Sequence, residues 1–226
     1  MRAFLVPVLF ILSFAVPAFA VGLEEGEAAP QQILIGLDLS KSNPLVEDPA
    51  YAARVSKRLG EELRALPVRS RVMVRTFGVY DASSNPLKID QVISARARPE
   101  EVAAGIETLV ANLPRLVEEG KLSSQMMTYI SAFLGTMSQS LDCSTLPTRV
   151  ILLTDGAEDS DLVKLKRSGT AMPAPSGPLY QGCDELVMLG LGQGFNDPAT
   201  TARFREAWGA WAKAAGFERF TGLYDW

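Results

Sequence analysis

The chain has 226 residues, 47% of them hydrophobic and 21% charged, and its formal net charge is −4. This length is enough for one domain with a full core. No Lys/Arg run stands out, which argues against nucleic acid or an anionic membrane surface as the main partner. The sequence contains no histidine, so a Ser-His-Asp triad, His-ligated zinc and imidazole acid–base chemistry are excluded.

Residues 1–20 have the layout of a secretory signal peptide. Arg2 precedes the apolar run LVPVLFILSFAV, and the small-x-small sequence AFA ends at Ala20. An uncleaved anchor is the alternative, because the apolar run is borderline for spanning a bilayer. The AFA site and Pro17 favour cleavage after Ala20. We therefore expect a periplasmic or secreted protein with no stable membrane insertion after cleavage.

Apolar runs of strand length alternate with segments of helical period along the rest of the chain. After a flexible lead-in over residues 21–32, a single domain is predicted over residues 33–226. Strands are predicted at 33–37, 71–77, 87–94, 149–154 and 185–191, with a last short strand in FERFTG near residue 220. Helices are predicted at 49–66, 99–112, 124–141, 159–166 and 198–215, with a broken helical stretch up to residue 119.

The order of these elements predicts an α/β fold. The runs RVILLT and ELVMLGL are wholly apolar, as in parallel strands that are buried on both faces. The strands at 71–77 and 87–94 are expected to form a hairpin, which adds one antiparallel edge strand. The sequence thus predicts a doubly wound, mostly parallel six-stranded sheet with helices on both faces.

The two cysteines, Cys143 and Cys183, fit an oxidising compartment and a single disulfide, with two free buried thiols as the alternative. Each precedes a predicted buried strand. If those strands are parallel neighbours, both cysteines lie at the amino-terminal edge of the sheet, opposite any site at the carboxyl edge.

Oxygen-bearing side chains follow two of the buried strands. Asp38, Ser40 and Ser42 come directly after the first strand, and Asp155 follows RVILLT. In an open parallel sheet, ligands bind at the carboxyl ends of the strands, where the strand order reverses. Two carboxylates and two hydroxyls at one point form an oxygen-only set that suits Mg²⁺ or Mn²⁺.

These residues carry a resemblance to a known family. The sequence DLSKS after a buried strand resembles the D-x-S-x-S signature of von Willebrand factor type A (vWA) domains, and LLTDG resembles their second acidic motif. The resemblance implies a metal-ion-dependent adhesion site (MIDAS). By this resemblance Ser40 and Ser42 bind the cation directly, Asp38 and Asp155 act largely through water, and a protein partner supplies an Asp or Glu to the metal.

The family's third motif is a Thr just before the helix that precedes RVILLT, and the sequence departs from it there. The local sequence is GKLSSQMMTYI, so another hydroxyl must serve. The family usually has an apolar residue two positions after this ligand. Ser124, followed by Met126, is therefore our choice, with Ser123 next and Thr128 third.

The same residues allow other functional interpretations. A phosphatase of the haloacid dehalogenase type needs a second Asp two positions after the first, where this chain has Ser40. Glu158 is expected to serve the amino terminus of the following helix, or else to occupy the open metal position. No nucleophile–base pair is evident, so catalysis is not predicted. The main alternative is a vWA-type structural module with a vestigial metal site, which binds partners through other surfaces.

Overall fold

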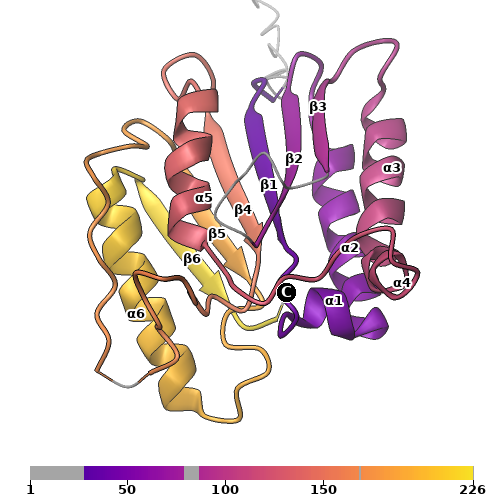
Figure 1. Cartoon of the computed structure of the whole chain (residues 1–226). Coiled ribbons are helices and arrows are strands. Elements are labelled where there is room, and N and C mark those ends of the chain that lie inside the picture. Colours follow the sequence, from indigo (N-terminus) through magenta and orange to yellow (C-terminus); the bar gives the residue numbers. More distant parts are fainter. Residues whose placement is uncertain (1–27, 79–86, 168, 226) are drawn as a thin grey trace, which may run out of the picture.

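The computed structural model describes residues 28–78, 87–167 and 169–225 (Figure 1). The predicted signal peptide, most of the predicted lead-in and the turn-rich segment 79–86 lie outside the described residues. Within them, strands and helices are mixed along the chain from β1 (Gln32–Asp38) to β6 (Arg219–Leu223).

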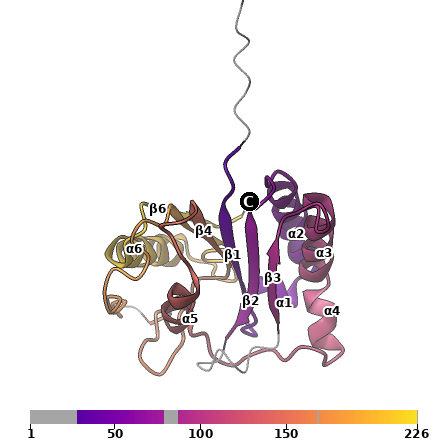
Figure 2. The ribbon, with the colours of Figure 1, turned by 90° about the horizontal axis from the view of Figure 1, so that it is seen from above.

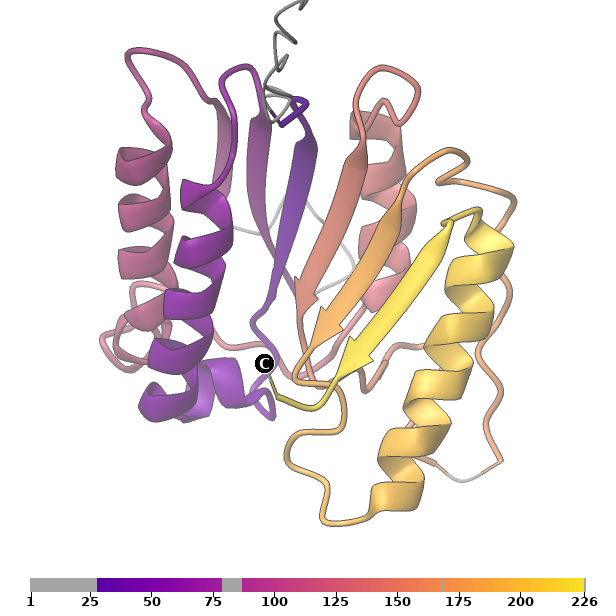
Figure 3. The ribbon, with the colours of Figure 1, turned by 180° about the vertical axis from the view of Figure 1, so that it is seen from behind.

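Six strands form one sheet in the order β3-β2-β1-β4-β5-β6. The remaining strands are β2 (Arg71–Phe77), β3 (Lys88–Val92), β4 (Thr148–Leu153) and β5 (Glu185–Leu189). Strand β1 pairs in parallel with β2 on one side and β4 on the other, while the edge strand β3 runs antiparallel to β2. Strand order therefore reverses between β1 and β4, and the carboxyl ends of the parallel strands point to one edge of the sheet (Figure 3).

Helices cover both faces of this sheet, so the predicted fold class is confirmed. One face carries α1 (Pro44–Glu47), α2 (Pro49–Arg64), α3 (Pro99–Ala111) and α4 (Leu113–Glu118), and the other carries α5 (Ile130–Met137) and α6 (Pro198–Ala215) (Figure 2). Helix α6 begins after Asp197, whose side chain caps it, and ends at Gly216, which has a φ of 94°. Gly216 therefore ends the helix in a left-handed conformation that glycine adopts readily.

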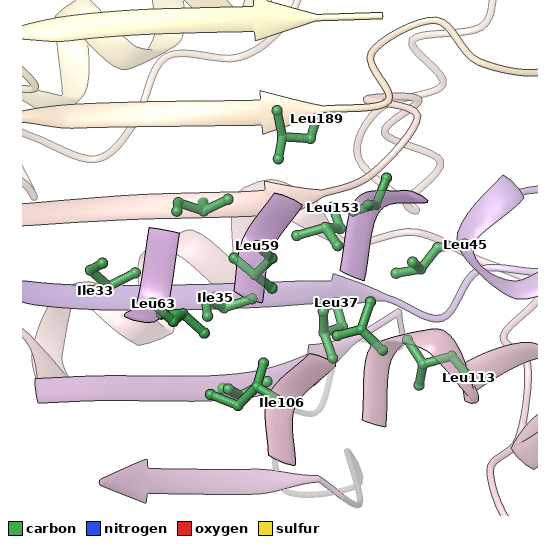
Figure 4. Packing of buried hydrophobic residues seen from close by; sticks show 14 of the residues in the cluster. Ile33, Ile35, Leu37, Leu45, Leu59, Leu63, Ile106, Leu113, Leu153 and Leu189 are labelled. Atoms are coloured by element: carbon green, nitrogen blue, oxygen red, sulfur yellow. The ribbon is translucent and has the colours of Figure 1, made fainter. Parts of the chain in front are cut away.

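Each face has its own hydrophobic core, because alternate side chains of a strand point to opposite faces. Ile35 and Leu37 of β1 pack with Leu59 of α2 on the first face (Figure 4). Leu34, the residue before Ile35, points to the opposite face and belongs to the second core together with Trp208 of α6. Burial on both faces explains why β1 and β4 read as continuous apolar runs rather than as an alternating pattern.

Two predicted helices differ in the structure. The helix predicted from residue 124 begins only at Ile130 and ends at Met137, followed by a short 3-10 turn, η2 (Ser138–Ser140). Before it, the backbone N–H of Gln125 donates to the Leu39 carbonyl, and its carbonyl accepts from the N–H of Lys41. These groups bond to the loop after β1, so they are not available to a helix.

The helix predicted at residues 159–166 is also wrong. Asp159 forms one bridge with Thr128 and another with Lys164, which folds this segment into a turn beside the loop before α5. Helix α1, which was not predicted, forms instead directly after the loop that follows β1.

The predicted disulfide between Cys143 and Cys183 is confirmed, with Cα atoms 4.8 Å apart. Both cysteines precede their strands, β4 and β5, and so lie at the amino-terminal edge of the sheet. A disulfide is typical of an oxidising, extracellular or periplasmic environment. In the part of the chain that the structure describes, no helix combines the length and the apolar character needed to cross a membrane.

Candidate metal centre

The loop after β1 is built around the carboxylate of Asp38, the last residue of the strand. Its Oδ1 accepts a hydrogen bond of 2.8 Å from the backbone N–H of Ser40, and its Oδ2 accepts one of 2.6 Å from the hydroxyl of Thr154. The side chain is fully buried. Both oxygens of Asp38 are thus already engaged by the protein, which suits a carboxylate that acts on a ligand indirectly.

Asp155 follows β4 and reaches toward the same loop. Its Oδ1 accepts from the N–H of Ala157 at 2.8 Å, and its Oδ2 accepts from the hydroxyl of Ser42 at 3.4 Å. The structure therefore brings Asp38, Ser40, Ser42 and Asp155 together at the switch point, as the sequence predicts.

Asn43 ties the ends of the two strands to each other. Its side-chain NH₂ group donates to the carbonyls of Asp38 and Leu153, both at 3.2 Å, while its Oδ1 accepts from the N–H of Leu45 at 3.0 Å and caps α1. Sequence reasoning missed both Asn43 and Thr154. The available signal was their position, since Asn43 directly follows DLSKS and Thr154 directly precedes Asp155. Asn and Thr are also common loop and capping residues.

The hydroxyl of Ser40 has no hydrogen-bond partner within the described residues, although it is buried. A buried polar atom without a partner is unfavourable and rare in folded proteins. A hard cation would satisfy this oxygen, since Mg²⁺ and Mn²⁺ prefer oxygen ligands. The donor set therefore fits the group that the resemblance implies.

A hollow of about 360 Å³ opens above these residues. It is lined by residues from three loops and from the end of α1, which are Ser40, Lys41, Ser42, Glu47, Gln125, Met126, Thr128, Asp159 and Lys166. Thr128 is buried and faces this hollow, whereas Ser123 and Ser124 do not line it. Of the three residues considered for the third ligand, Thr128 is the one that lines the same hollow as Ser40 and Ser42.

The two carboxyls have perturbed acidities. Burial raises the pKa of Asp38, and hydrogen bonds from the hydroxyl of Thr154 and the backbone N–H of Ser40 counteract this only in part. Burial and the nearby charge of Asp38 raise the pKa of Asp155 to about 7. Neither carboxylate forms a salt bridge with any described residue. The centre thus holds two buried acids that lack a direct positive partner, a situation that a bound cation would relieve.

Glu158 serves a different part of the molecule. Its two carboxylate oxygens accept from the backbone N–H and the hydroxyl of Ser131, each at 2.9 Å. It therefore stabilises the amino terminus of α5 rather than that of a following helix. It does not line the hollow, so the structure gives no support to the alternative in which Glu158 occupies an open metal position.

The centre differs from the commonest metal sites in its ligand types. Among residues 28–78, 87–167 and 169–225, no group of three or more His, Cys, Asp or Glu side chains is arranged to hold a metal ion. The candidate site combines hydroxyls with only two carboxylates, and it would present little negative charge directly to a cation.

Comparisons with known proteins add little to this picture. No family model matches the chain, and no curated protein does. Among solved structures, a pilus adhesin, SpaC from Lactobacillus rhamnosus GG, is similar at 21% identity and a TM-score of 0.39, over 59% of this chain and 16% of that chain. The human COPII-coat protein Sec24c is similar at 13% identity and a TM-score of 0.40, over 88% of this chain and 30% of that one.

The chain therefore spans less than a third of either of these proteins. Likenesses of this size do not identify a family. The fold and the centre define a class of protein, which has an open α/β sheet with an oxygen-rich centre at its switch point.

Proposed function

We propose that this chain is a periplasmic or secreted binding module of the vWA type, which engages a protein partner through Mg²⁺ or Mn²⁺ at this centre. The observation that carries the proposal is the buried, unpartnered hydroxyl of Ser40 beside two buried carboxyls. No catalytic role is proposed.

Each residue of the centre has a distinct role in this proposal. The hydroxyls of Ser40, Ser42 and Thr128 would hold the cation, and Asp38 and Asp155 would support it through water and through the hydrogen bonds that orient the loops. Thr128 takes the role that the sequence assigned to Ser124, because it lines the same hollow. A cation held largely by neutral hydroxyls keeps enough Lewis acidity to attract a carboxylate from a partner.

A vestigial site is the second candidate, and one contact favours it. The ammonium of Lys166 lies 3.3 Å from the hydroxyl of Ser42. A built-in cation at this place would reduce the need for a metal. The module would then bind its partners through other surfaces.

Titration calorimetry with Mn²⁺ and Mg²⁺ separates the two candidates. Ser40→Ala is the most informative variant, because it removes a hydroxyl without a partner and should leave the fold intact while abolishing metal binding. Ser123→Ala, at an exposed position outside the hollow, is the matched control and should bind like the wild type. The absence of binding heat with either metal would support the vestigial site.

The same assay decides the third ligand. Thr128→Ala should weaken Mn²⁺ binding by at least tenfold, the equivalent of about 1.4 kcal/mol, whereas Ser124→Ala should have little effect. The reverse result would restore Ser124. A pull-down from native extract, with Mg²⁺ or EDTA and with wild type or Ser40→Ala, then tests whether a captured protein depends on the metal.

A further inference from the structure

We infer that Lys166 is a built-in competitor of the divalent cation, and that its displacement sets how tightly this centre binds metal. The inference rests on the proposed function, because it concerns the regulation of the same site. It assigns to one lysine a role that neither the sequence motifs nor the resemblance provides.

The ammonium of Lys166 is in contact with a proposed ligand. Its Nζ donates to the hydroxyl oxygen of Ser42 at 3.3 Å, and that hydroxyl in turn donates to Oδ2 of Asp155 at 3.4 Å. The positive charge of Lys166 also counteracts the elevation of the pKa of Asp155. Lys166 thus supplies part of the positive charge that the two buried carboxyls lack.

Two other lysines near the centre do not share this arrangement. Lys164 forms an ion pair with Asp159. Lys41 lines the same hollow but is exposed, and it has no ion pair with a described residue. Lys166 is therefore the lysine that touches the proposed hydroxyl ligands.

The backbone around Lys166 is held in place while its side chain is exposed. The guanidinium of Arg203, on α6, donates to the carbonyls of Leu165 and Arg167 at 2.8 and 2.9 Å. The Lys166 ammonium lies 5.7 Å from the centre of the Phe195 ring. A lysine has a flexible four-carbon stem, so its ammonium can swing into water without movement of the anchored backbone.

The ammonium and a divalent cation would compete for the same oxygen. A hydroxyl that donates to Asp155 has only its lone pairs left for ligands, and Lys166 occupies one of them. Two positive charges a few ångströms apart also repel each other. The ammonium therefore disfavours a metal ion at this hydroxyl, and metal binding favours displacement of the ammonium.

Calorimetric titration with Mn²⁺ tests this inference on the wild type, Lys166→Met and Lys41→Met. Methionine keeps an apolar stem beside Phe195 and removes the charge. We expect Lys166→Met to bind Mn²⁺ roughly tenfold more tightly than the wild type. Lys41→Met should change the affinity by about threefold or less, because its exposed charge is screened. Lys166→Arg, which retains the charge, should not show the gain.

The outcomes separate this inference from the proposed function. Suppose that the wild type binds Mn²⁺ and that Lys166→Met gains no more Mn²⁺ affinity than Lys41→Met does. That result would overturn the inference and leave the proposed function intact. Binding by Lys166→Met alone would support the inference. Absence of Mn²⁺ binding in every variant, Lys166→Met included, would overturn both.

Discussion

Replacement of Asp155 by Asn should stabilise the protein in EDTA at neutral pH while it removes the response to metal. Asp155 is 1% exposed, and burial and the charge of Asp38 raise its pKa from 3.8 to about 7. The other ionisable groups that interact with it are Lys166 and the buried Tyr51. An ionised Asp155 is therefore opposed by its surroundings unless a cation is added.

The sign of the pH dependence follows from this shift. A carboxyl whose pKa is higher in the folded state binds more protons there, so the free energy of unfolding falls as pH rises from about 4 to about 7. A shift of this size corresponds to roughly 4 kcal/mol over the whole window. Between pH 5 and pH 7.5 we expect the wild type to lose on the order of 2 kcal/mol through this group.

Asparagine is a suitable replacement because it can keep both hydrogen bonds. Its Oδ1 can accept from the N–H of Ala157, and its NH₂ group can donate to the hydroxyl of Ser42. Urea denaturation followed by circular dichroism, in EDTA at pH 5 and 7.5, measures the effect. The Asn variant should keep a smaller pH dependence, through Asp38. Added Mg²⁺ should stabilise only the wild type.

The control is Asp48→Asn, which exchanges one good capping residue for another at an exposed helix start. It should leave both the pH dependence and the response to Mg²⁺ unchanged. If Asp155→Asn were less stable than the wild type at pH 7.5 in EDTA, the charge at Asp155 would be favourable, and the account of a centre short of positive charge would be refuted.

Three further predictions concern the framework around the centre. A Cys143→Ser/Cys183→Ser variant should lose up to ~4 kcal/mol in urea denaturation, because the bridge spans a separation of 40 residues, yet Mn²⁺ affinity should not change at the opposite edge. Asn43→Ala should cost about 2 kcal/mol and weaken Mn²⁺ binding, because two buried carbonyls lose their donor. Gly156→Ala should destabilise by about 2 kcal/mol, since its φ is 76° and an added Cβ would clash with the side chain of Leu191. Gly105→Ala, with open space around it, should instead stabilise helix α3 by roughly 0.5–1 kcal/mol.

Much of the fold could be predicted because its local signals agree with its tertiary structure. The predicted strand at residues 71–77 and the helix at residues 198–215 coincide with β2 and α6. The helix has a capping Asp197 before it and Gly216 after it, and the strands of the centre are apolar runs too short for helices. These features depend on neighbours in the sequence.

The segments that were predicted wrongly depend on distant residues. Residues 124–129 contain good helix formers, but the backbone of Gln125 bonds to Leu39 and Lys41, and Thr128 pairs with Asp159. Residues 159–166 likewise form a turn that is held by the bridges of Asp159 to Thr128 and Lys164. The pairing that holds both segments joins residues that are far apart in the sequence, so no local pattern predicts it.

The choice of the third hydroxyl depends on where the helix before β4 begins. The resemblance places this ligand just before a helix, and a helix predicted from residue 124 makes Ser124 the natural choice. In the structure the helix begins at Ile130, so Thr128 is the hydroxyl just before it, and Ile130 is itself the apolar residue two positions later. Thr128 also lines the hollow with Ser40 and Ser42. With the observed helix start, the same spacing rule selects Thr128 in place of Ser124. That start depends on backbone bonds between Gln125 and the loop after β1.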